Sequence, residues 1–191
     1  RAAVLLPWAV PTVVSAKIWA WIFNTDLGIL NYALISFGLI NADINWLGKP
    51  GYALAAAITV DVWKTTPFAA LLLLAGLQVI PDELYKAASV DGASRWQKFR
   101  HITIPHLKPV IMIVLLFRTL DAFRVFDAIY ILTGGGPANT TETLSIYAYK
   151  ILFQTLDFGY GSTIAVSVFV AVMFISLGYI MILRRRGGLL S

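Results

Sequence analysis

The stretch KAASVDGASRWQKFRHITIP, residues 86–105, lies between two long apolar segments of a 191-residue chain. The chain as a whole is 59% hydrophobic and 13% charged, whereas soluble domains carry about a quarter charged residues. A compact basic stretch inside such a chain is typical of a loop between membrane-spanning helices. The sequence therefore predicts an all-α, polytopic membrane helix bundle.

Four apolar segments around this stretch approach or exceed the roughly 20 residues that cross a bilayer as a helix. We expect membrane spans at about 2–23, 52–80, 107–132 and 161–183, and a loop at about 81–106. The loop and the C-terminal Arg184-Arg185-Arg186 are rich in positive charge, whereas the connections 24–51 and 134–160 hold one lysine each. The positive-inside rule makes the loop and the C-terminus cytoplasmic and the other two connections external. Membrane orientation thus explains the net charge of +5 better than a nucleic-acid partner does.

Residues 81–105 predict two short helices joined by a tight turn. Gly92 permits a backbone angle that other residues resist, and Ser94 with Gln97 forms a capping box that starts the second helix. Pro105 is expected to end that helix. An apolar face is expected to hold the element against its own membrane domain: Trp96, Phe99 and Ile102. The element suits docking of a partner protein, and the alternative is an ordinary amphipathic loop.

Ala87-Ala88, Gly92, Ile102 and Pro105 follow a spacing that resembles the cytoplasmic loop of permease subunits in binding-protein-dependent ABC importers. The motif of that family is EAA, three residues, Gly, nine residues, Ile, one residue and Leu-Pro. The stretches LLPWAVPTVV, VWKTTPFAALLLLAGLQ and FDAIYILTGGGP are similar to its carbohydrate-uptake branch, the maltose/trehalose-type permeases, and the resemblance covers essentially the whole chain. Lys86 replaces the Glu of the motif, and Ile104 replaces its last Leu.

The resemblance implies one transmembrane permease domain over residues 1–191, with the type I ABC importer permease core. Because the sequence begins at Arg1 without Met, we expect N-terminal helices to be missing from it. The implied function is translocation of a sugar or oligosaccharide. The resemblance implies that the protein crosses a bacterial or archaeal plasma membrane several times. The implied partners are a second permease, two ATPase subunits that bind ATP and Mg, an extracytoplasmic substrate-binding protein and the lipid bilayer. We expect no cofactor, metal or enzymatic activity in this chain itself.

The resemblance also places the contact with the ATPase in the loop. The expected contact residues are Glu83, Lys86, Ala87, Ala88, Asp91, Gly92, Ala93, Phe99, Ile102 and Pro105. Lys86 carries the opposite charge to the Glu of the family motif. A second permease with the standard Glu would compensate, so the substitution favours a heterodimer.

Charged residues interrupt the apolar segments, and Arg118, Asp121, Arg124 and Asp127 recur at a spacing of three. Ionisable groups at membrane depth cost about 2.5–3.5 kcal/mol each, so they normally face a protein interior or a water-filled path. Sugar binding needs carboxylates, amides and aromatic faces. The expected substrate path therefore comprises Trp63, Lys64, Asp121, Phe123, Arg124, Asp127 and Tyr130. Charges at this spacing fall on one side of a helix and can pair with one another. The alternative is an internal ladder of ion pairs between helices that never touches substrate.

The sequence TGGGP at 133–137 interrupts the third apolar segment. Its glycines leave the backbone free to bend, and its proline prevents the helix from continuing. We expect an external gate here, and the alternative is a helix end followed by a turn. The gate residues would be Gly134, Gly135, Gly136 and Pro137. After it, residues 144–156 are apolar enough for a helix along or within the membrane surface.

Two other functions remain open. The first is an importer of the same architecture that carries a non-sugar solute. The second is a membrane-embedded enzyme that uses the charged residues for acid–base chemistry, which would turn over without a partner ATPase. No phosphate-binding loop supports an ATPase in this chain, because the three consecutive glycines lack a following Gly-Lys-Ser/Thr.

Overall fold

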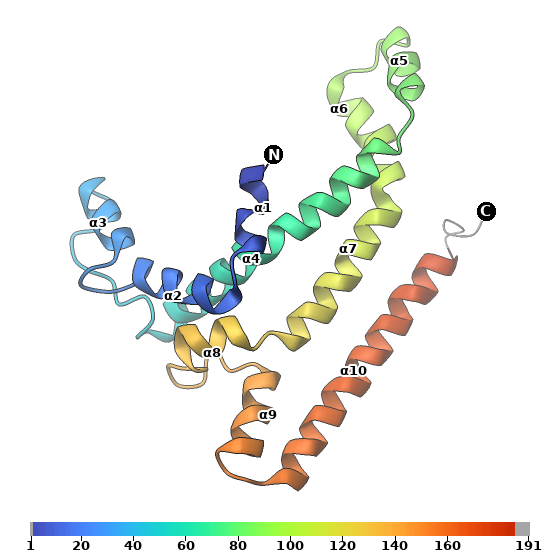
Figure 1. Ribbon diagram of the computed structural model, residues 1–191. Helices are drawn as coiled ribbons and strands as arrows, with labels where there is room; N and C mark the ends of the chain where they lie inside the picture. The colour runs from blue at the N-terminus through green and yellow to red at the C-terminus, as the bar shows by residue number, and fades with distance from the viewer. Residues whose placement is uncertain (1, 186–191) are drawn as a thin grey trace. The chain divides into compact units, whose positions relative to one another are not determined.

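The computed structural model describes residues 2–185 and, within them, the side chains of residues 5–182. These residues form helices and connections without a strand (Figure 1). Three helical stretches in this range are long and apolar enough to cross a membrane: Pro50–Gln78, Arg95–Arg124 and Phe158–Ile182. The expectation of an all-α membrane protein is confirmed, although the membrane-length helices number three here rather than four.

The chain divides into two compact units. The first comprises Arg1–Pro67 and Phe123–Val170, and the second comprises Phe68–Ala122 and Ala171–Ser191. Helix α4 (Pro50–Gln78) and helix α10 (Phe158–Arg185) each contribute residues to both units. The expected basic cluster at the C-terminus lies outside the residues whose side chains are described, as does Arg1.

The first expected span, 2–23, is two short helices instead of one. Helix α1 covers Ala2–Ala9 and helix α2 covers Thr12–Ile22. An unbroken α-helix would need an amide hydrogen on Pro11 to bind the carbonyl of Pro7, and proline has none. The helix therefore bends at Val10 and restarts after Pro11.

The hydrophobic core of the first unit is formed by α2, the first part of α4 and helix α8 (Asp127–Thr133). Small alanines on α4 let the neighbouring elements approach closely. The core residues are Phe23, Ala56, Ala57, Val60 and Leu132. Trp19 stacks on Phe23, with ring centroids 5.3 Å apart, so aromatic rings close one side of this core.

The first expected external connection is ordered around Asn31, which lies in helix α3 (Ile29–Ser36) and is 2% exposed. Its amide nitrogen donates to the carbonyls of Thr25 and Ile44, both at 3.0 Å. Its oxygen accepts from the indole nitrogen of Trp46 at 2.8 Å and from the amide of Ile44 at 3.3 Å. This one side chain thus binds both ends of the connection and leaves none of its own polar atoms unsatisfied.

The second long helical stretch starts earlier than expected. It consists of α6 (Arg95–Lys98), a π-helical turn η1 (Phe99–Thr103) and α7 (Ile104–Arg124). Pro105 therefore lies inside the helix and does not end it, contrary to the sequence-based expectation. In the π turn, the amide of Ile104 donates to the carbonyl of Phe99, one residue further back than in an α-helix. This wider turn accommodates the proline ring and its missing donor.

The third expected span, 107–132, is also divided, because α7 ends at Arg124 and α8 begins at Asp127. Phe126 between them has φ −137° and ψ −66°, which is not helical. Asp127 therefore does not share a helix with Arg118, and the expectation of a four-residue charged ladder on one helix is wrong. Helix α9 (Leu144–Phe153) confirms the apolar helix expected at 144–156.

In the second unit, the end of α4 packs closely on α7. A Cβ atom added to Gly76 would lie 2.8 Å from Val110 and 2.9 Å from Leu107. Phe68 and Phe117 meet edge to face at 5.9 Å. The absence of a side chain at Gly76 thus allows two long helices to approach each other, as small residues commonly do in membrane proteins.

Candidate functional site

The expected coupling loop is a helix–turn–helix in the second unit. Helix α5 (Asp82–Val90) carries two acidic residues in its first turn, where they interact favourably with the helix dipole. The turn that follows depends on Gly92, whose φ is +75°. The amide of Gly92 donates to the carbonyl of Ser89 at 3.2 Å, and the amide of Ala93 donates to that of Ala88 at 2.9 Å. The expected tight turn is thus confirmed, with glycine at a position where L-residues are strained.

The second arm of this loop is fixed by side chains. Ser94 and Gln97 form the expected capping box, at 2.7 Å and 3.3 Å. The ammonium of Lys98 donates to the hydroxyl of Ser89 at 2.6 Å, which ties α6 to α5. These bonds make the two arms and the turn one hydrogen-bonded element.

The same loop is anchored at its base by a hydroxyl pair. The oxygens of Tyr85 and Thr103 lie 2.9 Å apart, and Thr103 is 9% exposed. Tyr85 belongs to α5 and Thr103 belongs to the π turn, so this contact connects the loop to the long helix that follows it. A movement of the loop would therefore be transmitted directly to the long helix.

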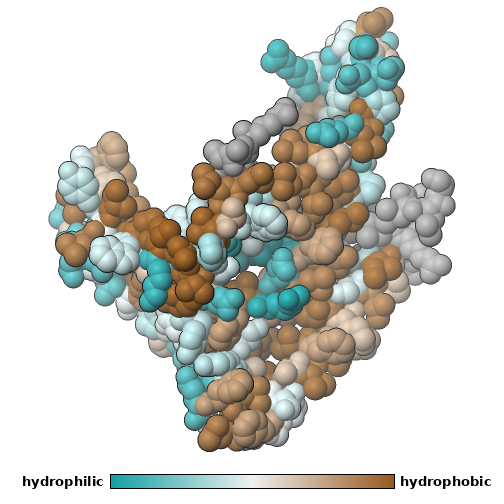
Figure 2. Space-filling model, in the orientation of Figure 1, coloured by the Kyte–Doolittle hydropathy of each residue, from teal (hydrophilic) through white to brown (hydrophobic). Residues whose placement is uncertain are grey.

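The apolar residues of the loop are exposed rather than packed. Val90 is 89% exposed, Trp96 66% and Phe99 44%. The expectation that Trp96 and Phe99 hold the loop against its own membrane domain is wrong, because their rings pack on each other, with centroids 5.5 Å apart. Figure 2 shows hydrophilic residues gathered over the same segment, α5 and α6. Exposed apolar side chains on an internally bonded element are typical of a protein-docking surface.

Most of the expected contact residues are accessible at this surface. The exposed ones are Glu83, Lys86, Ala87, Asp91, Gly92, Phe99 and Pro105, and the half-buried ones are Ala88, Ala93 and Ile102. Gly92 therefore lies in the turn between two helices, α5 and α6, and both helices carry exposed side chains.

The expected substrate-path residues fall in both units. Asp121 belongs to the second unit, whereas Trp63, Phe123 and Arg124 belong to the first. Trp63 is half-buried and meets Trp19 edge to face at 5.6 Å. Its ring therefore contributes to packing between α2 and α4.

Tyr130 lies in an aromatic cluster between α8 and α9. Its ring stacks on Phe126 at 5.0 Å and meets Tyr149 at 5.2 Å, and Tyr149 also meets Phe153 at 5.1 Å. Asp127, exposed at the start of α8, lies within the same short helix. Asp127 and Tyr130 are thus the expected path residues that share α8, and sequence reasoning did not name the other rings of the cluster.

Lys64, an expected substrate contact, binds backbone carbonyls of the same chain. Its ammonium donates to the carbonyl of Pro7 at 2.9 Å, to that of Trp8 at 3.4 Å and to that of Val10. A charged group at membrane depth costs about 2.5–3.5 kcal/mol, and a hydrogen bond to a charged group contributes about 1.5–3 kcal/mol. Its contacts with the backbone thus offset the cost of placing this lysine in an apolar helix.

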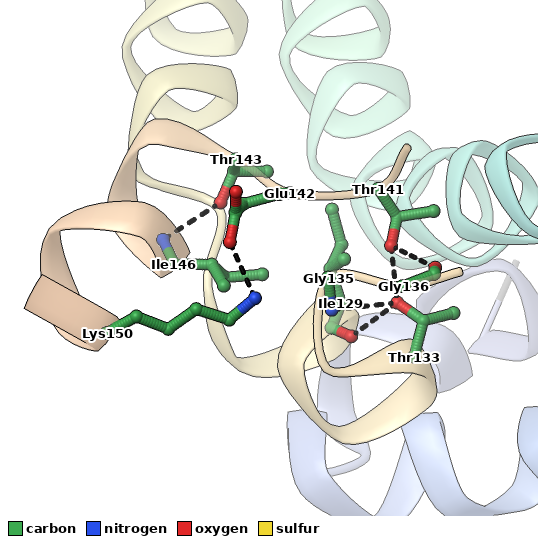
Figure 3. Close-up of polar contacts among 9 residues, drawn as sticks. All are labelled: Ile129, Thr133, Gly135, Gly136, Thr141, Glu142, Thr143, Ile146 and Lys150. Carbon is green, nitrogen blue, oxygen red and sulfur yellow. Dashed lines mark hydrogen bonds and ion pairs between the residues drawn. The ribbon is translucent and has the colours of Figure 1, made fainter. Parts of the chain in front are cut away.

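The expected gate begins where α8 ends. Gly134 and Gly135 have φ values of +63° and +93°, a region that strains other residues. A Cβ atom on Gly135 would lie 3.2 Å from the ammonium nitrogen of Lys150 and 3.4 Å from Ile146 (Figure 3). Glycine at these two positions permits the left-handed backbone, and at Gly135 it also leaves room for the close approach of α9.

Hydrogen bonds hold the loop after α8 in place. The hydroxyls of Thr133 and Thr141 lie 2.6 Å apart, and that of Thr141 donates to the carbonyl of Gly136 at 2.8 Å. Lys150 and Glu142 form an ion pair at 2.6 Å (Figure 3). These bonds close the loop in this structure, and the external gate stays a prediction.

Two further hydroxyls reach back to the end of α7. Thr143 caps α9 and donates to the carbonyl of Val125 at 2.9 Å, and Ser145 donates to that of Phe123 at 3.1 Å. Sequence reasoning missed these residues and also Thr133, Thr141, Glu142 and Lys150. The one available signal was Thr143 before an apolar run, which is typical of a helix N-cap.

Across the described part of the chain, no group of His, Cys, Asp and Glu side chains forms a metal-binding arrangement.

Residues 1–186 match the family described as binding-protein-dependent transport system inner membrane component. The chain belongs to this family. It is 48% identical over 186 residues to the trehalose/maltose transport system permease protein MalF of Thermococcus litoralis, covering 97% of this chain and 62% of that one. It is 43% identical over 180 residues to the trehalose transport system permease protein SugA of Mycobacterium tuberculosis, covering 94% and 56%.

Two crystal structures of a bacterial alginate importer have the same fold as this chain. One, of an ABC transporter involved in importing the acidic polysaccharide alginate, matches with a TM-score of 0.86 and 28% identity, over 95% of this chain and 63% of that one. The other contains a periplasmic protein bound to an alginate pentasaccharide, with a TM-score of 0.87, 27% identity and coverage of 97% and 64%. The chain thus spans less than two thirds of the length of each of these relatives.

A substitution at Gly92 should open the turn of the loop. No atom lies within 4 Å of an added Cβ atom, so Gly92→Val would act through its φ of +75° alone. The strain is about 1–2 kcal/mol or more, so we expect hydrogen exchange of the Ala93 amide to accelerate about tenfold. Gly92→Asn is the matched control, because asparagine tolerates this backbone region. Equal exchange in the valine variant and the native chain would show that the turn carries no such constraint.

Proposed function

We propose that this chain is the transmembrane permease part of an ATP-driven importer for a sugar or oligosaccharide. The observation that carries the proposal is the 82–98 loop, an internally bonded element with exposed apolar residues, in a member of a transport-permease family. A permease has no nucleotide site of its own and must receive the energy of ATP through a surface of this kind. The partners proposed are a second permease, two ATPase subunits and an extracytoplasmic binding protein.

The relatives support a carbohydrate substrate. Two of them are named as permeases for trehalose or maltose, and the structural relatives belong to an importer of alginate. One of the latter was crystallised with its periplasmic protein bound to an oligosaccharide. We infer delivery by a comparable protein outside the cell membrane, which this chain would cross several times.

The geometry of the loop supports its role in coupling. Because Lys98 is bonded to Ser89 and Tyr85 contacts Thr103, the two arms move together with the start of α7. An ATPase that grips Val90 and Trp96 would therefore move the long helix rather than deform the loop. Lys86 is exposed beside this surface, and its charge supports a second permease with the standard acidic residue.

Asp127 and the neighbouring aromatic rings are the proposed contact with substrate. Sugar rings stack on aromatic faces, and a carboxylate accepts hydrogen bonds from hydroxyl groups. Asp127 begins α8 and is exposed, and the rings of Phe126, Tyr130 and Tyr149 lie against one another nearby. This set combines both kinds of group within two short helices.

The proposal is tested with the complete importer in lipid vesicles. Purified full-length permeases, ATPase subunits and binding protein are supplied with labelled trehalose, maltose or longer glucose oligomers. We expect uptake that requires both ATP and the binding protein. Uptake of a non-sugar solute alone would favour the first alternative, and product formation without the ATPase subunits would favour a membrane enzyme.

The orientation can be tested with single cysteines, since the chain has none of its own. A cysteine at the exposed Arg95 should react with an impermeant maleimide only from the cytoplasmic side. One at the exposed Thr140 should react only from outside. Thr140 is preferable to Asn139, whose φ of +57° would strain a cysteine. Labelling from the opposite sides would overturn the orientation and the assignment of the coupling loop.

Alanine at Asp127 should weaken transport without preventing assembly. A lost hydrogen bond to a charged group is about 1.5–3 kcal/mol, so the sugar concentration for half-maximal uptake should rise about tenfold or more. Asp26→Ala is the matched control, because Asp26 is also an exposed acidic residue of the first unit. If the Asp127→Ala importer carries every tested sugar at the native rate and affinity, the substrate path lies elsewhere.

A further inference from the structure

The break between α1 and α2 brings together backbone carbonyls that lack their ordinary helical donors. The carbonyl of Pro7 would be bonded by the amide of residue 11 in a continuous helix, but that residue is Pro11. The carbonyl of Trp8 loses its donor because α1 ends at Ala9, and α2 begins only at Thr12. In a bilayer no water is present to replace those donors, so another group must supply them.

One side chain from a distant part of the sequence reaches these oxygens. The ammonium nitrogen of Lys64 lies 2.9 Å from the carbonyl oxygen of Pro7 and 3.4 Å from that of Trp8, and it also binds that of Val10. Lys64 lies fourteen residues from either end of α4, which covers Pro50–Gln78. It is therefore about 21 Å of helix from each end, in the part of a membrane helix where a charge is least expected.

The number and direction of the donors match the oxygens. A primary ammonium has three N–H donors arranged around one nitrogen and no acceptor. Three oxygens converge on that nitrogen, so each N–H has a partner. A guanidinium is planar and presents its donors as a fork, which does not suit oxygens converging on a single point.

We propose that the carbonyls of Pro7, Trp8 and Val10 form a binding site for a primary ammonium ion, which Lys64 fills from within the chain. Filling this site positions α1 and the start of α2 on the middle of α4. Unwound backbone carbonyls coordinate cations in other transporters, and here a tethered cation replaces a dissolved one. Lys64 is thus a positioning residue rather than a contact with the transported solute.

Ser15 reports whether the start of α2 is in place. It is 1% exposed, and its hydroxyl donates to the carbonyl of Pro11 at 3.2 Å. Val14, the preceding residue, is 47% exposed. A cysteine at Ser15 should therefore react slowly with N-ethylmaleimide while one at Val14 reacts fast, and only the first should respond to release of α2.

The test uses the complete importer, assembled from full-length chains in detergent solution, with a single cysteine at Ser15. Lys64→Ala should speed labelling about tenfold, because local opening then has no ammonium to oppose it. Addition of propylammonium should restore slow labelling, since this ion supplies the missing three donors on a short chain. Tetramethylammonium at equal concentration has no N–H donor and should not.

Two controls separate this site from a general effect of charge. Lys17→Ala removes an exposed lysine from α2 and should leave labelling of Ser15→Cys unchanged. Val14→Cys should be labelled at one rate in every variant. Because labelling is measured without transport, the result stands apart from the outcome of the uptake experiment.

The outcomes are distinct. Slow labelling in Lys64→Ala, or equal restoration by tetramethylammonium, would overturn the proposal. If Lys64→Ala does not assemble, the assembled yield becomes the measurement. Recovery of that yield with propylammonium and not with tetramethylammonium supports the site, and failure of both ions to recover it overturns the site.

Discussion

The carbonyl oxygen of Pro7 has no amide donor one turn ahead, and the ammonium of Lys64 takes the place of that donor. The same constraint recurs where α7 ends, because the carbonyls of Phe123 and Val125 are bound by the hydroxyls of Ser145 and Thr143. Lipid offers no hydrogen bonds, so a membrane helix can be broken only where protein groups satisfy the freed oxygens. The breaks in this chain are therefore also the places where distant segments are joined.

Two lysines in apolar helices bind groups of the chain itself. Lys64 lies in a membrane-length helix and binds backbone, whereas Lys150 of α9 pairs with Glu142 in the loop after α8. The groups left exposed are different: Asp127 begins a short helix beside an aromatic cluster, and Val90 and Trp96 project from a loop tied by its own bonds. Internal bonding of the loops leaves these groups at the surface of the chain.

Some features of the 82–98 loop could be predicted because they depend on residues a few positions apart. The capping box of Ser94 and Gln97 and the turn at Gly92 are both of this kind, and both are present. The position of Pro105 inside a helix could not be predicted, since it depends on a π turn that the sequence pattern does not mark. The packing of Trp96 was likewise mistaken, because periodicity shows which face is apolar and not what covers it.

The sequence by itself determined the all-α class, three of the four expected membrane-length helices and the helix–turn–helix at 82–98, because hydropathy and capping act over one helix or one turn. The glycines after Thr133 also marked the end of α8 in advance. Only the tertiary structure decided how the breaks in the helices are satisfied. Lys64 binds oxygens 54–57 residues away, and Ser145 binds one 22 residues away. Such partners are chosen by which helices pack together, and no local pattern in the chain records that choice.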